Sequence, residues 1–150
     1  MNKTAYIFTG QGFDSDQIPN YSKSKYYEEV SSQFFEVFGQ TLPKYDEIDK
    51  HDIKKNEIST AIICISSLDK IDFAKNHLDI PSYCAGYSVG QYIALHFAGC
   101  ISRDILISTI FKRCKSMNQA SVKNKASLIT ILGLPLTGII DLIEDNNLSN

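Results

Sequence analysis

The chain has 150 residues, of which 43% are hydrophobic and 21% charged, and this composition predicts a globular protein with one substantial core. A net charge of -2 provides no long-range attraction to phosphate groups, which argues against nucleic acid or a membrane surface as partner. Residues 1–4 lead straight into a short strand-like segment without the apolar stretch of a signal peptide, and no apolar run approaches membrane-spanning length. We therefore expect a cytoplasmic protein.

The cysteines Cys64, Cys84, Cys100 and Cys114 are widely separated in the chain. They form no CxxC pair, and no histidines stand at zinc-binding spacing. We expect buried free thiols and no metal site.

The first half of the chain predicts one strand and two helices. Residues 5–8 are a short apolar run that ends in Thr9-Gly10-Gln11-Gly12, the pattern of a buried strand leading into a glycine-rich loop. Apolar residues at helical spacing predict a helix over 26–38 that ends near Gly39, and an irregular connection follows over 40–55. A second helix is predicted over 57–76, with these residues near one face: Ile58, Ile62, Ile65, Leu68 and Phe73.

The second half continues the alternation. Pro81 opens a predicted strand over 82–85, residues 86–90 turn the chain, and a helix over 91–98 ends at Gly99. Ser102 is expected to cap a helix that runs to about Ala120. A strand over 126–132 and a final helix after Pro135 complete the pattern. The helix after Ser102 has apolar positions at Ile105, Ile110 and Cys114. In the final helix, Ile139, Ile140 and Ile143 are expected to be buried. Strands alternating with helices predict an α/β fold with a parallel sheet.

Gly86-Tyr87-Ser88-Val89-Gly90 matches the G-x-S-x-G pattern, and it falls between a predicted strand and a predicted helix. This is the context of a nucleophile elbow, in which a tight turn exposes the serine hydroxyl at the N-terminus of a helix. The N–H of Val89 can then stabilise an oxyanion. An ordinary strand–helix turn is the alternative.

Three stretches together resemble malonyl-CoA:acyl carrier protein transacylases and the acyltransferase domains of polyketide synthases. Residues 8–12, Phe-Thr-Gly-Gln-Gly, are similar to the family's F-P-G-Q-G, and residues 85–92 to its A-G-H-S-L-G-E-Y. Arg113 and Met117 match its R-x-x-x-M, and residues 126–134 resemble the first strand of its small subdomain.

The resemblance implies a fold and its division. Residues 1–123 would form the N-terminal part of a large α/β-hydrolase-like acyltransferase subdomain with a parallel sheet. Residues 124–150 would begin a small ferredoxin-like subdomain.

The resemblance also implies an activity, in fatty acid or polyketide biosynthesis. Ser88 would take an acyl group from malonyl-CoA, or a related acyl-CoA, and pass it to the phosphopantetheine thiol of an acyl carrier protein. Gln11 and Val89 would supply the N–H pair of the oxyanion hole, and no permanently bound cofactor is implied. Arg113 would hold the free carboxylate of the substrate.

From the residues alone, Arg113 is more typical of a solvated helix arginine beside Lys112 and Lys115, and only the motif match favours the substrate-binding role. Met117 suits either core packing or the wall of a substrate site. The basic stretch 112–125 could receive CoA phosphates or an acidic carrier protein, or form a solvated face.

The family's catalytic histidine lies in the second half of a chain about twice this long. The histidines here are His51, His77 and His96. His96 follows Ser88 by eight residues on one predicted helix, about 12 Å along the axis, which is too far to accept its proton. Three alternatives follow: the chain is a fragment, a second polypeptide supplies the C-terminal half, or the chain adopts another arrangement such as a swapped oligomer. The chain alone would be inactive or marginal.

Two residues beside Ser88 depart from the family pattern, Tyr87 replacing a histidine and Gln91 a glutamate. Tyr87 can still donate a hydrogen bond, so it is a candidate substrate-binding residue. Ser59-Thr60-Ala61 stands where the family has a glutamine. The alternative functions are a serine esterase or thioesterase, which shares the elbow, and a non-catalytic subunit that binds carrier protein.

Overall fold

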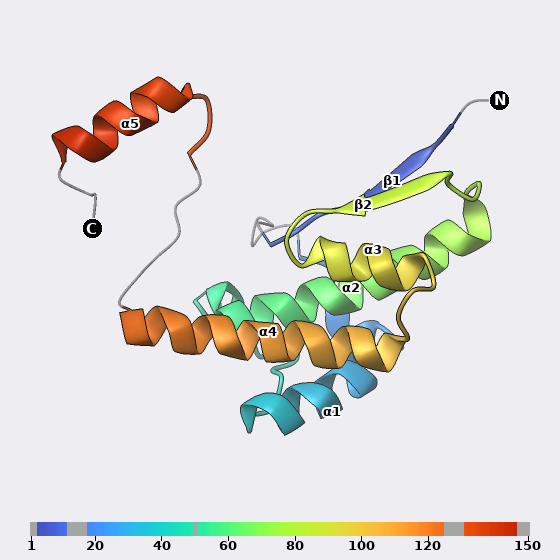
Figure 1. The fold of residues 1–150 in the computed structure, drawn as a ribbon. Coiled ribbons are helices and arrows are strands. Elements are labelled where there is room, and N and C mark those ends of the chain that lie inside the picture. The colour runs from blue at the N-terminus through green and yellow to red at the C-terminus, as the bar shows by residue number, and fades with distance from the viewer. Residues whose placement is uncertain (1–2, 12–17, 50, 125–130, 147–150) are drawn as a thin grey trace.

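The structure is a computed structural model that describes residues 3–11, 18–49, 51–124 and 131–146. Two parallel strands, β1 (Ala5–Phe8) and β2 (Tyr83–Gly86), lie at one side of a group of helices (Figure 1). The helices are α1 (Tyr27–Phe38), α2 (Asn56–His77), α3 (Gly90–Phe97), α4 (Arg103–Asn124) and α5 (Leu136–Asp145). Two 3-10 turns, Tyr21–Lys23 and Asp52–Lys54, interrupt the connections. This arrangement confirms the α/β expectation, with a small parallel sheet.

Both expected strands and four expected helices in 3–124 form within a few residues of the predicted bounds. Gly39 ends α1 at φ 70°, a left-handed conformation that glycine adopts without a Cβ clash. The Ser102 hydroxyl accepts a hydrogen bond from the Ile105 N–H at 3.3 Å, so Ser102 caps α4 as expected. Local sequence signals therefore place these elements correctly.

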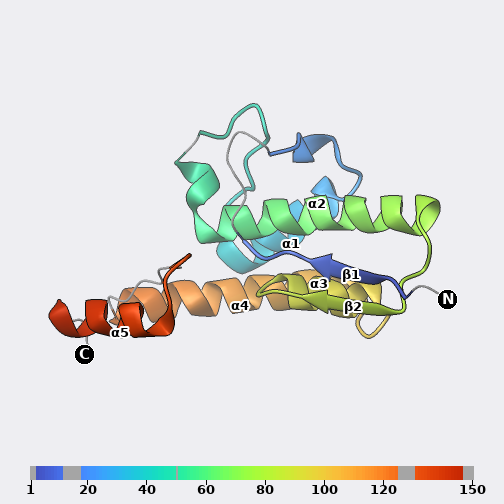
Figure 2. The same cartoon turned by 90° about the horizontal axis from the view of Figure 1, so that it is seen from above.

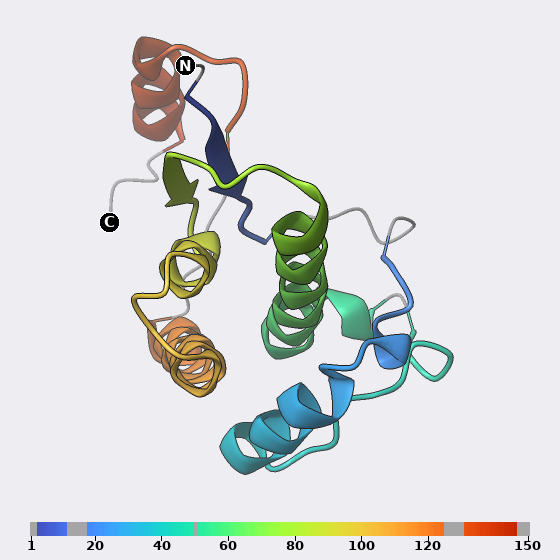
Figure 3. The same ribbon diagram turned by 90° about the vertical axis from the view of Figure 1, so that its right-hand side faces the viewer.

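The helices form layers beneath the sheet. Seen from above, α2 runs on the β1 side and α3 on the β2 side (Figure 2). Viewed along α2 and α4, the sheet lies on one side of them and α1 on the other (Figure 3). The Phe97 ring of α3 packs against Tyr6 and Phe8 of β1, with ring centroids 5.5 Å and 5.4 Å apart. One face of the sheet thus rests on α3.

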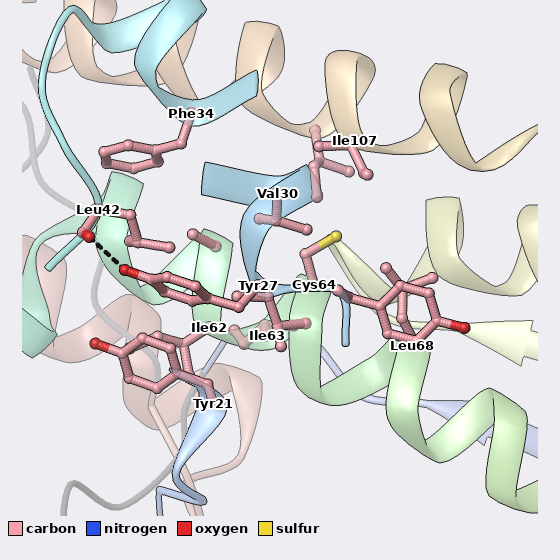
Figure 4. Close-up of a cluster of buried hydrophobic side chains, with 14 of the residues drawn as sticks. Tyr21, Tyr27, Val30, Phe34, Leu42, Ile62, Ile63, Cys64, Leu68 and Ile107 are labelled. Carbon is pink, nitrogen blue, oxygen red and sulfur yellow. Dashed lines mark hydrogen bonds between the residues drawn. The ribbon is translucent and has the colours of Figure 1, made fainter. Parts of the chain in front are cut away.

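The core lies between α1, α2 and α4 (Figure 4). Phe34 and Phe111 are fully buried and meet edge to face at 5.7 Å. Tyr27 is also buried, and its hydroxyl donates to the Leu42 carbonyl at 2.9 Å, so the polar end of the ring is satisfied. The core thus draws on both halves of the described chain.

Two apolar positions of the helical patterns are exposed, and the expectation of buried thiols is correct for only two of the four cysteines. Phe73 is 58% exposed and stacks on His77, because this part of α2 extends past the core. Ile105 is 52% exposed, since the core face of α4 is formed instead by Leu106, Ile107, Ile110, Phe111 and Cys114. Among the thiols, Cys64 and Cys114 are buried, whereas Cys84 is half-buried and Cys100 exposed. All four cysteines are free.

The last part of the chain differs from the expectation. Helix α5 follows Pro135 as predicted, but none of its residues is buried: Ile140 and Ile143 are exposed and Ile139 is half-buried. Figure 1 shows α5, in red, apart from the other helices, which explains this exposure. The strand predicted over 126–132 lies mostly outside the described residues, and residues 131–132 form no strand. The division at residue 124 stays a prediction.

Candidate functional site

Ser88 lies at the turn between β2 and α3, and its backbone has φ 53°. It is the one non-glycine residue with positive φ among those described. Such strain costs about 1–3 kcal/mol and persists only where the surroundings impose it. The predicted turn is therefore the sharp elbow that the G-x-S-x-G pattern requires.

The two glycines of the motif permit this turn. A Cβ on Gly86 would lie 2.1 Å from the Gly90 carbonyl oxygen, and a Cβ on Gly90 would lie 2.2 Å from the Phe8 carbonyl oxygen. No side chain fits at such distances. The start of α3 therefore packs directly on the end of β1, which brings the loop after β1 beside Ser88.

Gly10 continues this close approach. A Cβ at Gly10 would lie 3.0 Å from the Ser88 Cβ and 2.9 Å from the Tyr87 carbonyl oxygen. The neighbouring backbone of Gln11 therefore lies near the nucleophile. Within the described part of the chain, the N–H groups of Gln11 and Val89 donate to no protein acceptor. An oxyanion hole requires N–H donors that have no such acceptor, and among the described residues both groups meet this condition.

Arg113 reaches Ser88 from α4, twenty-five residues further along the chain. Its Nη2 donates to the Ser88 Oγ at 3.3 Å, a long but direct hydrogen bond. The arginine is half-buried and forms no ion pair with any described carboxylate. The structure thus brings together two residues that the sequence singled out separately, and it excludes a fully solvated arginine.

The other predicted residues lie around this pair. Met117 follows Arg113 by one turn of α4 and is half-buried. Tyr87 is 71% exposed and lines a cavity of about 510 Å³ between β1 and α2. Gln11 also lines this cavity, but Ser88 and Arg113 are not among the described residues of its wall.

The side chain of Gln11 makes contacts that sequence patterns do not reveal. Its Nε2 lies 2.7 Å from Asn56 Oδ1, 3.0 Å from Ser59 Oγ and 2.9 Å from Thr60 Oγ1, all on the first turns of α2. Asn118 of α4 accepts a hydrogen bond from Asn56 at 2.7 Å. These residues belong to no motif, and only the packing of α2 on α4 places them together.

No histidine of the chain contacts Ser88. The Nδ1 of His96 donates to the Ile101 carbonyl at 3.1 Å, and that of His77 to the Phe73 carbonyl at 2.9 Å. His51 is exposed beside the turn Asp52–Lys54. The expectation that none of them serves as base is consistent with these positions.

Thiol chemistry is not supported at the buried cysteines. Burial raises the pKa of Cys64 to about 12, and burial also raises the pKa of Cys114. Thiols with raised pKa values stay protonated and unreactive near neutral pH. Among the described residues, no group of three or more His, Cys, Asp or Glu side chains could hold a metal ion. No described helix is long and apolar enough to cross a membrane.

The fold and the site define a class of protein: an α/β chain with a serine at a strand–helix elbow, as in enzymes that form acyl-serine intermediates. No family model matches the chain. It is 28% identical to the malonyl CoA-acyl carrier protein transacylase of Bacillus subtilis, covering 89% of this chain and 43% of that protein. The transacylase of Buchnera aphidicola is 27% identical, covering the whole chain and 50% of that protein.

Solved structures give the same result for the fold. The malonyl-CoA:ACP transacylase of Synechocystis matches with a TM-score of 0.62 at 23% identity, over 79% of this chain and 41% of that one. The transacylase FabD of Acinetobacter baumannii matches with a TM-score of 0.64 at 20% identity, over 97% and 47%. The chain spans about half the length of these relatives. Its resemblance to malonyl-CoA:acyl carrier protein transacylases is thus confirmed, and the partial coverage fits an N-terminal half.

Proposed function

We propose that Ser88 accepts a malonyl or related acyl group from CoA and transfers it to the phosphopantetheine thiol of an acyl carrier protein. The contact between Arg113 Nη2 and Ser88 Oγ carries this proposal. A guanidinium can bind the free carboxylate of a malonyl group through two parallel hydrogen bonds. Hydrolysis of a simple ester needs no such cation, so the contact favours a transacylase over an esterase.

The reaction would proceed in two steps through a covalent intermediate. The Ser88 Oγ attacks the thioester carbonyl carbon, the carbon–sulfur bond breaks, and CoA leaves as its thiol. The negative charge on the carbonyl oxygen faces the N–H groups of Gln11 and Val89. The thiol of the carrier protein then attacks the ester and releases Ser88. Malonyl-CoA is a substrate in this scheme, and no permanently bound cofactor takes part.

Met117 and Tyr87 are proposed to flank the bound acyl group. Met117 stands one turn beyond Arg113, so it can contact the acyl chain whose carboxylate Arg113 holds. Tyr87 directly precedes the nucleophile and is exposed, so its hydroxyl is available to the substrate. Both side chains belong to elements that already hold Ser88 or Arg113.

The base is proposed to come from a C-terminal half, carried either by a longer form of the same chain or by a second polypeptide. The positions of the three histidines support this, since none of them contacts Ser88. The length of the relatives, about twice that of this chain, supports it as well. Residues 1–123 would then be part of the large subdomain and 124–150 the beginning of the small one.

Chemical rescue tests this proposal on the chain as it stands. Incubation with malonyl-CoA and free imidazole, which replaces the missing base, should place a malonyl ester on Ser88, detectable by mass spectrometry. Ser88→Ala under the same imidazole should show no ester. Arg113→Ala should lower malonyl labelling by about 10- to 100-fold, the value of a hydrogen bond to a charged group, and leave acetyl labelling unchanged. Arg113→Lys keeps the positive charge but not the two parallel hydrogen bonds of a guanidinium. Its malonyl labelling should therefore lie between those of the native chain and of Arg113→Ala.

Equal labelling by acetyl-CoA, together with no effect of Arg113→Ala, would show that Arg113 does not bind the carboxylate. Release of the acyl group to water at the rate of transfer would favour an esterase or thioesterase. No ester under any condition, with carrier-protein binding undiminished in Ser88→Ala, would favour the non-catalytic subunit.

A further inference from the structure

A chain of three carboxamides joins the loop after β1 to helix α4. Gln11 Nε2 donates to Asn56 Oδ1 at 2.7 Å, Asn56 Nδ2 donates to Asn118 Oδ1 at 2.7 Å, and Asn118 Nδ2 donates to Glu57 Oε2 at 2.9 Å. All four side chains are half-buried. Each of the two central amides uses its oxygen towards one neighbour and its nitrogen towards the next.

The Glu57 carboxylate accepts the last hydrogen bond of this relay and determines the direction of the others. An ionised carboxylate only accepts, so Asn118 must turn its NH₂ group towards Glu57. Its oxygen then faces Asn56, whose own oxygen must face Gln11. Hydrogen bonds in such a sequence polarise and strengthen one another. The Gln11 amide is therefore oriented from α4, through the Asn56 side chain, together with the Asn56 backbone carbonyl, which accepts from the same nitrogen at 3.3 Å.

Gln11, the first member of this hydrogen-bond relay, is also the residue whose backbone lies beside Ser88. The Gln11 side chain is held by Asn56, Ser59 and Thr60, while Gly10 is packed against Ser88. A side chain held on one side and a backbone held on the other leave the Gln11 N–H little freedom to move. An oxyanion hole depends on donors fixed before the reaction begins.

We infer that Asn56 and Asn118 are positioning residues, which hold the Gln11 N–H beside Ser88 and tie it to the helix that carries Arg113. This inference rests on the proposed function. Asn118 follows Arg113 by five residues, about 7.5 Å along the same helix. The relay thus keeps the donor for the oxyanion and the cation for the carboxylate at a constant separation. Neither asparagine needs to touch the substrate.

A charge-swap series on the full chain tests the relay. Asn118→Asp keeps an acceptor for Asn56 but brings a second carboxylate against Glu57, so the relay should break. The double variant Glu57→Gln with Asn118→Asp supplies a donor at position 57 for the new carboxylate and should restore it. Gln119→Ala, at the exposed neighbouring position, is the matched control.

Two measurements follow the relay. In ¹H–¹⁵N spectra, the Gln11 backbone and side-chain amide signals should shift in Asn118→Asp and return in the double variant. The rate of Ser88 acylation at saturating malonyl-CoA, with imidazole present, should fall about tenfold and return, because a misplaced catalytic group slows the reaction. The half-saturating concentration of malonyl-CoA should stay unchanged, since Arg113 is intact.

The outcomes separate the inference from the proposed function. If the native chain forms no acyl ester, the proposed function fails, while the Gln11 signals still test the relay. Gln11 signals at their native positions in Asn118→Asp would overturn the inference, as would a double variant that restores neither signal nor rate. An equal response to Gln119→Ala would overturn it too, because the effect would then belong to the helix in general.

Discussion

At the scale of single residues, Ser88 has a backbone conformation that is sterically unfavourable for an L-amino acid. Ser88 has φ 53°, where a Cβ crowds the backbone. The tight turn imposes this conformation, and Gly86 and Gly90 permit the turn because it has no room for side chains on either side. The position of the hydroxyl is thus obtained at a cost in stability. Functional sites commonly store strain in this way.

Ser88→Gly should therefore raise the free energy of unfolding by about 1 kcal/mol relative to Ser88→Ala, because glycine adopts positive φ without a Cβ clash. Urea denaturation of both variants measures the difference. Neither variant carries a hydroxyl, so loss of the Arg113 hydrogen bond cancels in the comparison. Equal midpoints would mean that the elbow relaxes when the hydroxyl is removed.

At the scale of elements, the start of α1 is tied to the outer face of α2 by one carboxylate. The Tyr26 hydroxyl donates to Asp72 at 2.6 Å, and Lys25 forms an ion pair with the same oxygen. The hydrogen bond from Lys25 lowers the pKa of Asp72 most, and that from Tyr26 adds to it. A carboxyl with a lowered pKa in the folded state stabilises the fold above its unfolded pKa, near 4, and loses this effect as pH falls through the folded value.

Asp72→Asn should accordingly lower the free energy of unfolding at pH 7 by about 0.5–1 kcal/mol, the range for partly exposed pairs. The deficit should shrink as pH falls below about 4, where Asp72 becomes protonated in the unfolded chain, and should vanish as pH falls through its lower pKa in the folded state. Denaturation at both pH values measures it. Asp79→Asn is the control, because its carboxylate bonds to no described residue and its removal should change little at either pH.

At the scale of the whole molecule, one face of the sheet is open. In the register of β1 and β2, Ala5, Ile7, Tyr83 and Ala85 share the face away from α3, and all four are exposed. Ile7 is 75% exposed and Tyr83 59% exposed. Parallel sheets are normally covered on both faces, so a two-stranded sheet with an apolar open face is unusual.

Ile7→Thr should change the free energy of unfolding by no more than about 0.5 kcal/mol, as surface substitutions do, and should reduce binding of a hydrophobic dye. Ile65→Ala, at a fully buried position of α2, should cost about 2–5 kcal/mol through lost burial and a cavity. Thermal and urea unfolding compare the two. A loss at Ile7 as large as that at Ile65 would show that the face is covered in solution by another copy of the chain.

The sequence by itself determined the order of the elements, the elbow and the spacing of Arg113 from Ser88. These depend on residues close together in the chain, where hydrophobic period, glycine and capping act directly, and Gly39, Ser102 and Gly86–Gly90 all behave as their local chemistry predicts. The resemblance of the short motifs to known transacylases added the proposed roles.

Only the tertiary structure decided which faces are covered and which distant residues meet. Phe73, Ile105 and Ile140 satisfy a helical pattern yet are exposed, because burial requires an opposing surface and period alone does not supply one. Asn56 and Asn118 stand 62 residues apart and belong to no motif, so only the packing of α2 on α4 brings their amides together. The contact of Arg113 with Ser88 depends on another tertiary contact, the packing of α4 beside α3, which turns a spacing in the sequence into a site.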